Sequence, residues 1–371
     1  VNGRAQGVET LTLEDCLRIG IDNNLSLESK RREIQKSKYG VSENRARLLP
    51  QISAVAGYSN NFDPPVSVTD GSSYGVPYNI TQTLQHSANA GLEMQMPLFN
   101  QTLYTSMSIA KVVEEISRLS YGKAREDIIL QISKMYYLGQ VTAEQIVLIK
   151  ANITRLEELR DITRAFFDNG MSMEVDLKRV NINLENLKVQ YDNAQAMMKQ
   201  QLNMLKYIMD YPAEKEIALT PVNTDSITTV ALTGLSENLY ELQLTQSQLE
   251  LAERQKRMIT NGYIPSLSLT GNWRYAAYTD KGYHWFHSGP SNHWFRSYGL
   301  GLTLRIPIFD GLDKTYKIRK AMIDIENRKL AWEDTRKNLQ TQYLNAVNDL
   351  MNNQRNFKKQ KDNYLLAEDV Y

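Results

Sequence analysis

The chain repeats one plan of elements, and this repeat constrains its fold more than any other feature of the sequence. Residues 49–55 read Leu-Pro-Gln-Ile-Ser-Ala-Val, and residues 264–270 read Ile-Pro-Ser-Leu-Ser-Leu-Thr. Residues 92–100 and 302–310 match in the same way, with a proline at the same point. A spacing of about 210 positions between matching segments indicates two halves with one plan. Each half is predicted to run helix, proline, strand, polar loop, strand, proline and long helix.

Each half is predicted to open with a helix that ends before its first strand. In the first half this helix begins after Thr12, whose hydroxyl can cap it. It should run to about Leu48, because the residue before a proline is pushed out of the helical region. Its counterpart covers about Ser236 to Thr260 and ends at the helix stop signal Asn261-Gly262.

A much longer helix is predicted after each strand pair. No proline occurs between Pro97 and Pro212, and apolar residues recur there at helical spacing. A helix from about Gln101 to Phe167 would be roughly 100 Å long at about 1.5 Å per residue, far beyond a globular helix. Asp168-Asn169-Gly170 should break it.

The segment after this break is predicted to pack back on the long helix as an antiparallel coiled coil. Its apolar residues alternate between spacings of three and four, the heptad pattern: Leu177, Val180, Leu184, Leu187, Tyr191, Ala194 and Met198. The second half repeats the pattern from Leu339 to Phe357. Between the halves, a stretch from about Tyr207 to Gly234 contains a short strand-like run at 217–220. We expect it to be a connector on the outside of the helical layer.

The predicted strands alternate polar and apolar residues, which is typical of a sheet with one polar and one apolar face. Aromatic residues crowd the strand ends and loops, as at a membrane interface. A soluble antiparallel sheet would show the same alternation. Four strands are too few to close a barrel, so a membrane-spanning sheet would need several copies of the chain. The polar positions include Glu93, Gln95, Ser268, Thr270, Asn272, Arg274, Thr303 and Arg305.

Composition excludes some classes of protein. The net charge is +1, so nucleic acid is not a predicted partner. The mean hydropathy is −0.46, and no apolar run approaches the roughly 18 residues of a helical membrane span. Strands could still cross a bilayer, because alternating strands are only mildly apolar.

No motif indicates an enzyme, a cofactor or a resident metal. The sequence has no Ser/His/Asp set, phosphate-binding glycine loop or HExxH motif. His284, His287 and His293 lie close together in a predicted outer loop, where a zinc or copper site is conceivable, but the aromatic residues around them favour an interfacial loop. Cys16 is the only cysteine, and a packed helix position is favoured for it over lipidation. Residues 1–6 have the small residues of a cut signal-peptide end.

Together these features make the chain resemble the TolC-type family of outer membrane efflux proteins. The resemblance rests on the duplicated plan and on the paired prolines, Pro50 with Pro265 and Pro97 with Pro307. It also rests on the turn at 166–177, Phe-Phe-Asp-Asn-Gly-Met-Ser-Met-Glu-Val-Asp-Leu. That turn is similar to the tip of the family's helical hairpin.

The resemblance implies a mixed α and β membrane protein of the Gram-negative outer membrane that extends into the periplasm. It also implies a homotrimer, in which a twelve-stranded transmembrane β-barrel, with four strands from each chain, would continue into a long coiled-coil α-barrel. It implies an exit duct of a tripartite efflux or type I secretion system. Its partners would be a periplasmic adaptor, an inner-membrane pump and outer-membrane lipid. The polar strand residues would face the lumen, and the adaptor would contact Phe167, Asn169, Gly170, Met171, Ser172 and Asp176.

On this basis the chain divides into eight segments. They are an N-terminal extension (1–10), a periplasmic helix (11–49), a first β-hairpin (50–98), a helical hairpin with its tip at 166–176 (99–206), an equatorial connector (207–235), a second periplasmic helix (236–262), a second β-hairpin (263–308) and a long helix (309–371). Aligned on the repeat, Tyr371 corresponds to Asp161, so the last helix is expected to stop before a second tip. No gate residues or cargo are therefore assigned. A soluble coiled-coil scaffold with a small sheet domain is the alternative.

Overall fold

The computed structural model describes residues 9–82, 84–222, 238–279 and 294–370, together with Gly234 and Ser236. These residues form two compact units, one centred on a β-sheet and one on a helical hairpin. The sheet unit comprises residues 36–115 and 245–334, and the hairpin unit comprises residues 1–35, 116–244 and 335–371. Several long helices contribute residues to both units, so each unit is described by itself.

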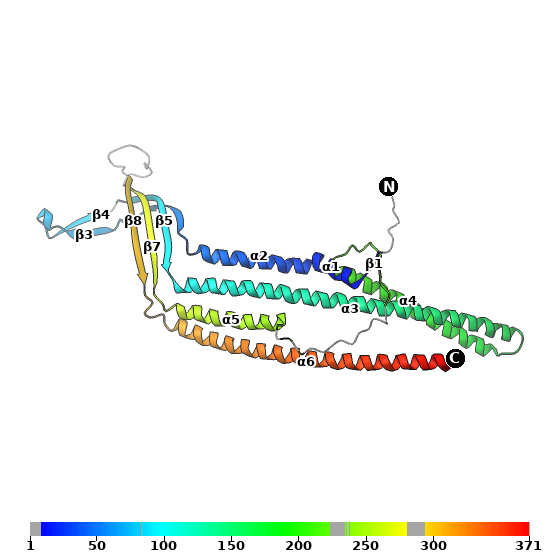
Figure 1. Ribbon diagram of the computed structural model, residues 1–371. Helices are drawn as coiled ribbons and strands as arrows, with labels where there is room; N and C mark the ends of the chain where they lie inside the picture. Colours follow the sequence, from blue (N-terminus) through cyan, green and yellow to red (C-terminus); the bar gives the residue numbers. More distant parts are fainter. Residues whose placement is uncertain are drawn as a thin grey trace, which may run out of the picture. The chain divides into compact units, whose positions relative to one another are not determined.

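The sheet unit is built on four antiparallel strands in the order β2-β5-β7-β8. They are β2 (Gln51–Asn60), β5 (His86–Phe99), β7 (Ser266–Thr279) and β8 (Trp294–Arg305), seen side by side in Figure 1. Helix α2 (Leu25–Ala46) precedes β2, and α5 (Tyr240–Asn261) precedes β7. Helix α3 (Gln101–Asp168) follows β5, and α6 (Asp313–Val370) follows β8. The order helix, strand, strand, helix therefore occurs twice along the chain.

The segment between β2 and β5 was expected to be a polar loop, and this expectation is wrong. It contains a two-stranded antiparallel hairpin of β3 (Val66–Asp70) and β4 (Tyr78–Gln82), joined through the 3-10 turn η1 (Ser72–Tyr74). Val68 lies opposite Ile80. The hairpin forms because β-branched residues alternate with polar ones on both sides of a glycine-containing turn.

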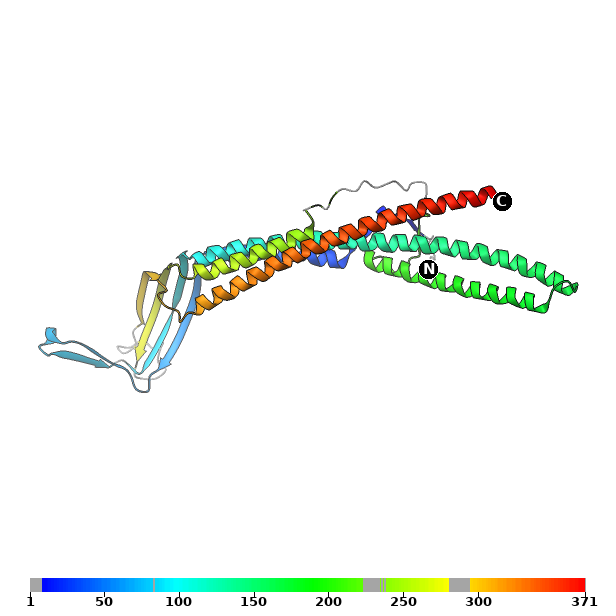
Figure 2. The same cartoon turned by 90° about the horizontal axis from the view of Figure 1, so that it is seen from below.

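The hairpin unit contains the antiparallel pair of α3 with α4 (Glu174–Met209), which lie side by side in Figures 1 and 2. The start of α3 is capped by Asn100, whose Oδ1 accepts hydrogen bonds from the backbone N–H groups of Thr102 (3.0 Å) and Leu103 (3.2 Å). The predicted heptad is confirmed, because the positions from Leu177 to Met198 that it names are the less exposed ones of α4. Leu184 and Ala194 are buried.

The core of the hairpin unit lies where α1 (Leu13–Asn23), α3 and α4 meet a small parallel sheet. That sheet pairs β1 (Glu9–Leu11) with β6 (Ile217–Leu219). Its core cluster includes Cys16, Leu27, Ile132, Leu205 and Met209. Cys16 in α1 is fully buried, which confirms the prediction of a packed helix cysteine, and this burial raises the pKa of its thiol to about 11.

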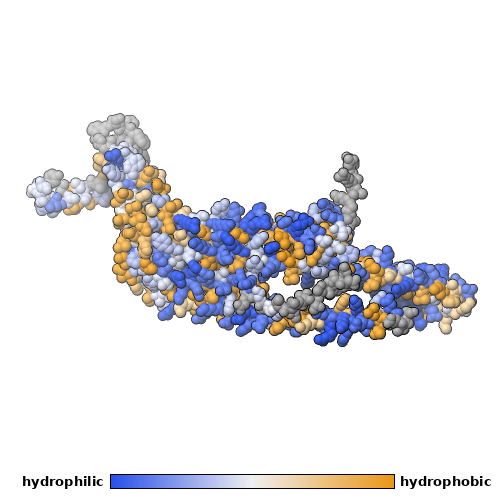
Figure 3. All heavy atoms as spheres, viewed as in Figure 1, coloured by the Kyte–Doolittle hydropathy of each residue, from blue (hydrophilic) through white to orange (hydrophobic). Residues whose placement is uncertain are grey.

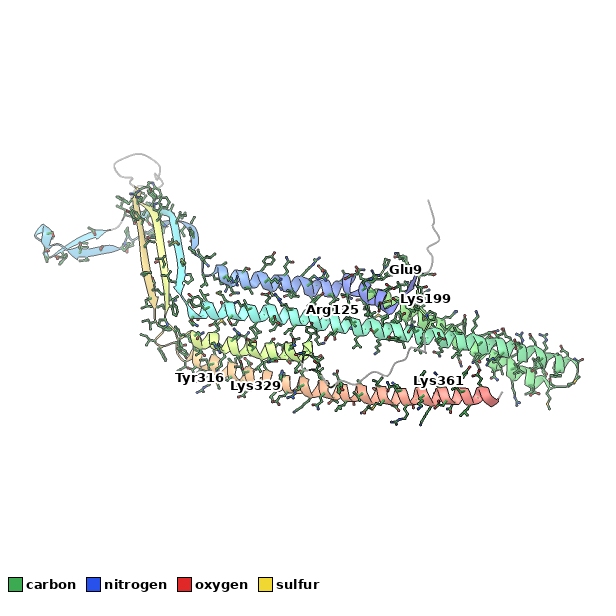
Figure 4. The ribbon with its side chains drawn as sticks, in the orientation of Figure 1. Glu9, Arg125, Lys199, Tyr316, Lys329 and Lys361 are labelled. Carbon is green, nitrogen blue, oxygen red and sulfur yellow. The ribbon has the colours of Figure 1, made fainter. Side chains whose placement is uncertain are left out.

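The strand β1 corrects the expectation that residues up to 10 form an N-terminal extension. Glu9 pairs with Ile217 across the small sheet, and the Tyr211 hydroxyl donates a hydrogen bond to Glu9, 2.5 Å, beside α1 and α4 (Figure 4). This hydrogen bond raises the pKa of Tyr211 to about 12. The sheet is held on α3 because the Gln140 side chain donates to the carbonyl of Thr220, 2.6 Å. A three-residue strand has no periodicity of its own, and its partner is far along the chain.

The single helix predicted from Thr12 to Leu48 is also wrong, because it is interrupted at Asn24. The Asn24 Oδ1 accepts hydrogen bonds from the backbone N–H groups of Ser26 (2.9 Å) and Leu27 (3.1 Å), which makes it the N-cap of α2. Its Nδ2 donates to the carbonyl of Ile208, 2.7 Å, near the end of α4. One side chain thus starts α2 and satisfies a carbonyl at the end of another helix.

Replacing Asn24 with alanine is expected to lower the free energy of unfolding by about 1–2 kcal/mol, because both the cap and the bond to Ile208 are lost. Asn24→Ser should lower the free energy of unfolding by less, because serine can still cap α2 although it cannot reach the carbonyl of Ile208. Denaturant unfolding of the purified protein measures both values. Equal stability of wild type and Asn24→Ala would contradict the assignment of this cap.

Candidate functional site

The eight polar residues predicted to line a lumen lie on one face of the four-stranded sheet. Residues directly opposite each other in an antiparallel pair point to the same face. Glu93 lies opposite Asn272, Gln95 opposite Thr270, and Ser268 opposite Thr303. Arg274 and Arg305 follow at even spacings along β7 and β8, so they share this face. The register therefore brings together residues from both halves of the chain, on what we call the polar face.

The polar face is concave and carries charges of both signs. A hollow of about 650 Å³ extends from β2 to β8, and its lining combines six polar residues and three glycines with Ile52, Met94 and Leu300. The Arg274 guanidinium donates to the Glu93 carboxylate, 3.2 Å. Both side chains are partly exposed, so this ion pair contributes about 1 kcal/mol or less. The position of this ion pair matters more than its energy, because it places a positive and a negative charge side by side in the middle of the polar face.

Strand β2 contributes residues to the polar face that sequence reasoning missed, among them Gln51 and Ser53. Gln51 lies opposite Gln95, and Ser53 lies opposite Glu93, so β2 contributes polar side chains beside those of β5. The alternation in β2 is weak because Ala54 and Ala56 occupy the opposite positions. The match of residues 49–55 with 264–270 was the signal that could have identified them, since Ser53 corresponds to Ser268.

The opposite face of the sheet, the apolar face, consists of large hydrophobic side chains that remain exposed. Tyr298, Leu300 and Leu302 are 75%, 78% and 67% exposed. Ile52, Leu92, Met94 and Trp273 share this face in the register. Hydrophobic side chains gather over β7 and β8 in Figure 3. A contiguous apolar surface of this kind marks contact with a membrane or another protein.

The turn between α3 and α4 is a tight reversal set by Gly170. The Gly170 N–H donates to the carbonyl of Phe167 (2.9 Å), and the Met171 N–H donates to that of Phe166 (2.8 Å). This pair of hydrogen bonds is a Schellman motif, which needs a left-handed residue after the helix. Gly170 supplies it with φ of 72°.

Side chains on both sides of Gly170 hold the turn. The Asn169 Nδ2 donates to the carbonyl of Ala165, 2.7 Å, and the Ser172 hydroxyl donates to that of Thr163, 3.4 Å. At the start of α4, the carboxylate of Asp176 lies 3.7 Å from the guanidinium of Arg179. The hydrogen bond from Lys178 holds the pKa of the Glu174 carboxyl below its usual range. Of the six predicted tip residues, Asn169, Ser172 and Asp176 therefore form bonds through their side chains. Phe167, Gly170 and Met171 take part in the turn through their backbone.

The turn also presents apolar side chains to solvent. Met171 and Met173 are both 73% exposed, and Phe166 and Phe167 are 49% and 38% exposed. Sequence reasoning missed Met173, although it flanks the predicted Ser172. Exposed methionines give an adaptable apolar contact surface.

Replacing Gly170 with alanine is expected to destabilise the turn by about 1–2 kcal/mol, the cost of a left-handed conformation for a residue with a Cβ. No atom lies within 4 Å of the position of that Cβ, so the cost is conformational and not steric. Asparagine tolerates this region better, so Gly170→Asn is the matched control. Hydrogen exchange of the Gly170 and Met171 amides measures the effect. Unchanged protection in Gly170→Ala would contradict it.

Metal sites and membrane-spanning helices are two further features to consider in the described part of the chain. Within that part, no group of three or more His, Cys, Asp or Glu side chains could hold a metal ion. No described helix is long and apolar enough to cross a membrane. His284, His287 and His293 lie outside the described residues. A hydrogen bond of 2.9 Å joins the Nδ1 of His86 to the Tyr58 hydroxyl, near the end of β2.

Comparison with known proteins identifies the family. The sequence model of the outer membrane efflux proteins matches residues 19–209, which is more than half of the chain. The chain belongs to the outer membrane efflux protein family. The resemblance predicted from the repeat and the turn is thereby confirmed, and so is the prediction of an outer membrane protein. This is a family of export proteins and not of enzymes.

Two curated relatives are similar over most of the chain. The outer membrane protein TolC of Vibrio cholerae is 20% identical over 319 residues, covering 84% of this chain and 66% of TolC. The probable efflux pump outer membrane protein TtgC of Pseudomonas putida is 22% identical over 276 residues, covering 70% of this chain and 53% of TtgC. The chain thus spans less than two thirds of the length of these relatives.

Solved structures share the fold at low identity. A membrane protein from Pseudomonas aeruginosa has a TM-score of 0.73 at 18% identity, covering 94% of this chain and 78% of that chain. CusC has a TM-score of 0.72 at 15% identity, with coverages of 96% and 81%. The open state of the Neisseria gonorrhoeae MtrE outer membrane channel has a TM-score of 0.68 at 19% identity, with coverages of 94% and 74%. These likenesses support the mixed helix and sheet fold of a TolC-like protein.

Proposed function

We propose that the chain is one protomer of a homotrimeric exit duct for a tripartite efflux or type I secretion system. The observation that carries the proposal is the four-stranded sheet. Its two faces have opposite polarity, and in the described part of the chain the outer edges of β2 and β8 have no partner strand. A sheet with open edges in a bilayer leaves backbone groups unsatisfied, so it must close.

Closure would pair β2 of one copy with β8 of the next and give a twelve-stranded barrel from three copies. The outer strands have 10 and 12 residues, close to the roughly 9–11 that a tilted strand needs to cross a bilayer. The apolar face would then contact outer-membrane lipid. The polar face, with Glu93, Arg274 and the other six residues, would line a water-filled lumen.

The helical hairpin would extend into the periplasm and contact an adaptor protein at its tip. The exposed Met171 and Phe167 would supply apolar contacts, and Asn169, Ser172 and Asp176 would supply polar ones around Gly170. The adaptor would join the duct to an inner-membrane pump. The duct itself would be passive, with the energy and the choice of cargo supplied by the pump.

Detergent extraction and mass determination test this proposal. We expect the protein to leave the membrane fraction only with detergent and to have a mass of about three chains in detergent solution, as barrel closure requires. A monomer that stays in the aqueous phase without detergent would support the alternative of a soluble coiled-coil scaffold. A detergent-soluble assembly of another size would retain the membrane location but overturn the geometry of four strands per chain.

A further inference from the structure

The apolar face carries one charged side chain among the residues of β2, β5, β7 and β8. Arg296 lies opposite Tyr275, and two residues further along β8 is Tyr298, which faces Trp273. The guanidinium carbon of Arg296 lies 5.8 Å from the centre of the Tyr298 ring. All other charged residues of these strands, Glu93, Arg274 and Arg305, are on the polar face. A charge facing lipid is costly unless it has a partner.

A hollow of about 490 Å³ lies on the same face, and Tyr298, whose ring Arg296 approaches, is one of its lining residues. It is open above Gly271, which has no side chain, and its walls include Ile52, Leu92, Met94, Trp273 and Leu300. A Cβ at position 271 would lie 3.1 Å from Leu300 and 3.2 Å from Met94. A residue with a side chain at this position would therefore occupy part of the hollow. The surface of the hollow is almost entirely apolar, as a hydrocarbon chain requires.

The charge and the hollow lie in line along the strands. From Arg296 to Leu300 is four residues of β8, about 13 Å at roughly 3.3 Å per residue. Arg296 lies near the start of β8, and α6 follows the other end of that strand. If the helices lie in the periplasm, as in the proposed function, Arg296 is at the level of the outer leaflet.

We propose that this surface binds a phosphorylated lipid of the outer leaflet, with its phosphate at Arg296 and an acyl chain in the hollow above Gly271. Arginine recognises phosphate oxygens through paired N–H donors. No carboxylate among the described residues forms an ion pair with Arg296 within the chain. A neighbouring copy would not supply one from β2 either, because the apolar face of β2 consists of Ile52, Ala54, Ala56, Tyr58 and Asn60. The proposal rests on the proposed membrane-embedded sheet.

Binding of lipid A and of its dephosphorylated form to the detergent-solubilised protein tests the proposal, with native mass spectrometry as the measurement. We expect wild type to prefer the phosphorylated lipid by about tenfold, the equivalent of roughly 1.4 kcal/mol. Arg296→Gln should lose this preference, and Arg296→Lys should keep part of it because the charge remains. Arg305→Gln removes an arginine from the polar face of the same strand, so it should behave as wild type.

A second variant tests the hollow separately from the charge. Gly271→Leu would fill the hollow, so both lipids should bind about tenfold more weakly while the preference for phosphate remains. Inorganic phosphate alone should compete only weakly, because it cannot use the hollow. Strong competition by phosphate would overturn the acyl-chain part of the proposal.

Two outcomes overturn the inference, and they are distinguishable from failure of the proposed function. If trimers that float with lipid vesicles show no preference for phosphorylated lipid A, or if Arg296→Gln keeps that preference, Arg296 merely extends toward water and the lipid site is wrong. If wild type neither floats with vesicles nor assembles, the membrane-embedded sheet fails, and the inference fails with it.

Discussion

Leu302→Arg is expected to abolish membrane insertion, while the neighbouring Thr303→Arg is expected to be tolerated. Leu302 is 67% exposed on the apolar face, and Thr303 lies on the polar face opposite Ser268. An arginine that faces lipid near the middle of a bilayer costs about 2–4 kcal/mol per chain in a transmembrane barrel. Three copies would carry that cost at once. An arginine facing the lumen stays hydrated and costs little.

This pair of variants distinguishes a membrane sheet from a soluble one. In a soluble sheet Leu302 would be in water, so arginine there would change stability by about 0.5 kcal/mol or less and would improve solubility. Flotation of each variant with lipid vesicles, together with its mass in detergent, gives the measurement. Insertion of Leu302→Arg at the wild-type level would refute the lipid contact of the apolar face.

Gly20→Ala is expected to destabilise the hairpin unit, whereas the same change at Gly40 should stabilise its helix. A Cβ at Gly20 in α1 would clash with the Cδ1 of Ile132, while no atom lies within 4 Å of one at Gly40 in α2. Ile132 is fully buried, so its Cδ1 can make way only by a change of rotamer within the packed core. Overpacking of this kind costs about 1–3 kcal/mol. Replacing a glycine at a half-buried helix position that has space for a Cβ, such as Gly40, gains up to about 1 kcal/mol.

The two glycine variants therefore should differ in sign as well as in size. Thermal or denaturant unfolding in one detergent is the measurement, and helix propensity is controlled because both changes are glycine to alanine within a helix. If both variants were stabilised, Ile132 would have space to rotate away, and the close packing of α1 on α3 would be contradicted.

The sequence predicted those elements whose signal is local and long. The 68-residue helix α3 was predicted to within a residue because nothing in the segment breaks a helix before Gly170. The heptad of α4 was predicted because its apolar residues alternate at spacings of three and four. Strand alternation identified the polar residues of β5, β7 and β8, since a period of two needs no knowledge of the partner strand.

Elements that depend on distant partners were not predictable in the same way. The strand β1 is short and exists because Ile217 and the end of α4 lie beside it. The break at Asn24 depends on the carbonyl of Ile208, and without that partner an asparagine in a helical pattern gives no clear signal. The hairpin of β3 and β4 was mistaken for a loop because its alternation is short and flanked by turn residues.

By itself the sequence determined the order of elements, the helical hairpin with Gly170 at its turn, and the two-sided character of each strand, because backbone propensity and periodicity act over neighbouring residues. Only the tertiary structure decided the strand order β2-β5-β7-β8. That register sets Glu93 beside Arg274, and it places Arg296 and the hollow at Gly271 on the same apolar face. The physical reason is that pairing between strands far apart in the chain is fixed by hydrogen bonds and side-chain packing, which no single strand encodes.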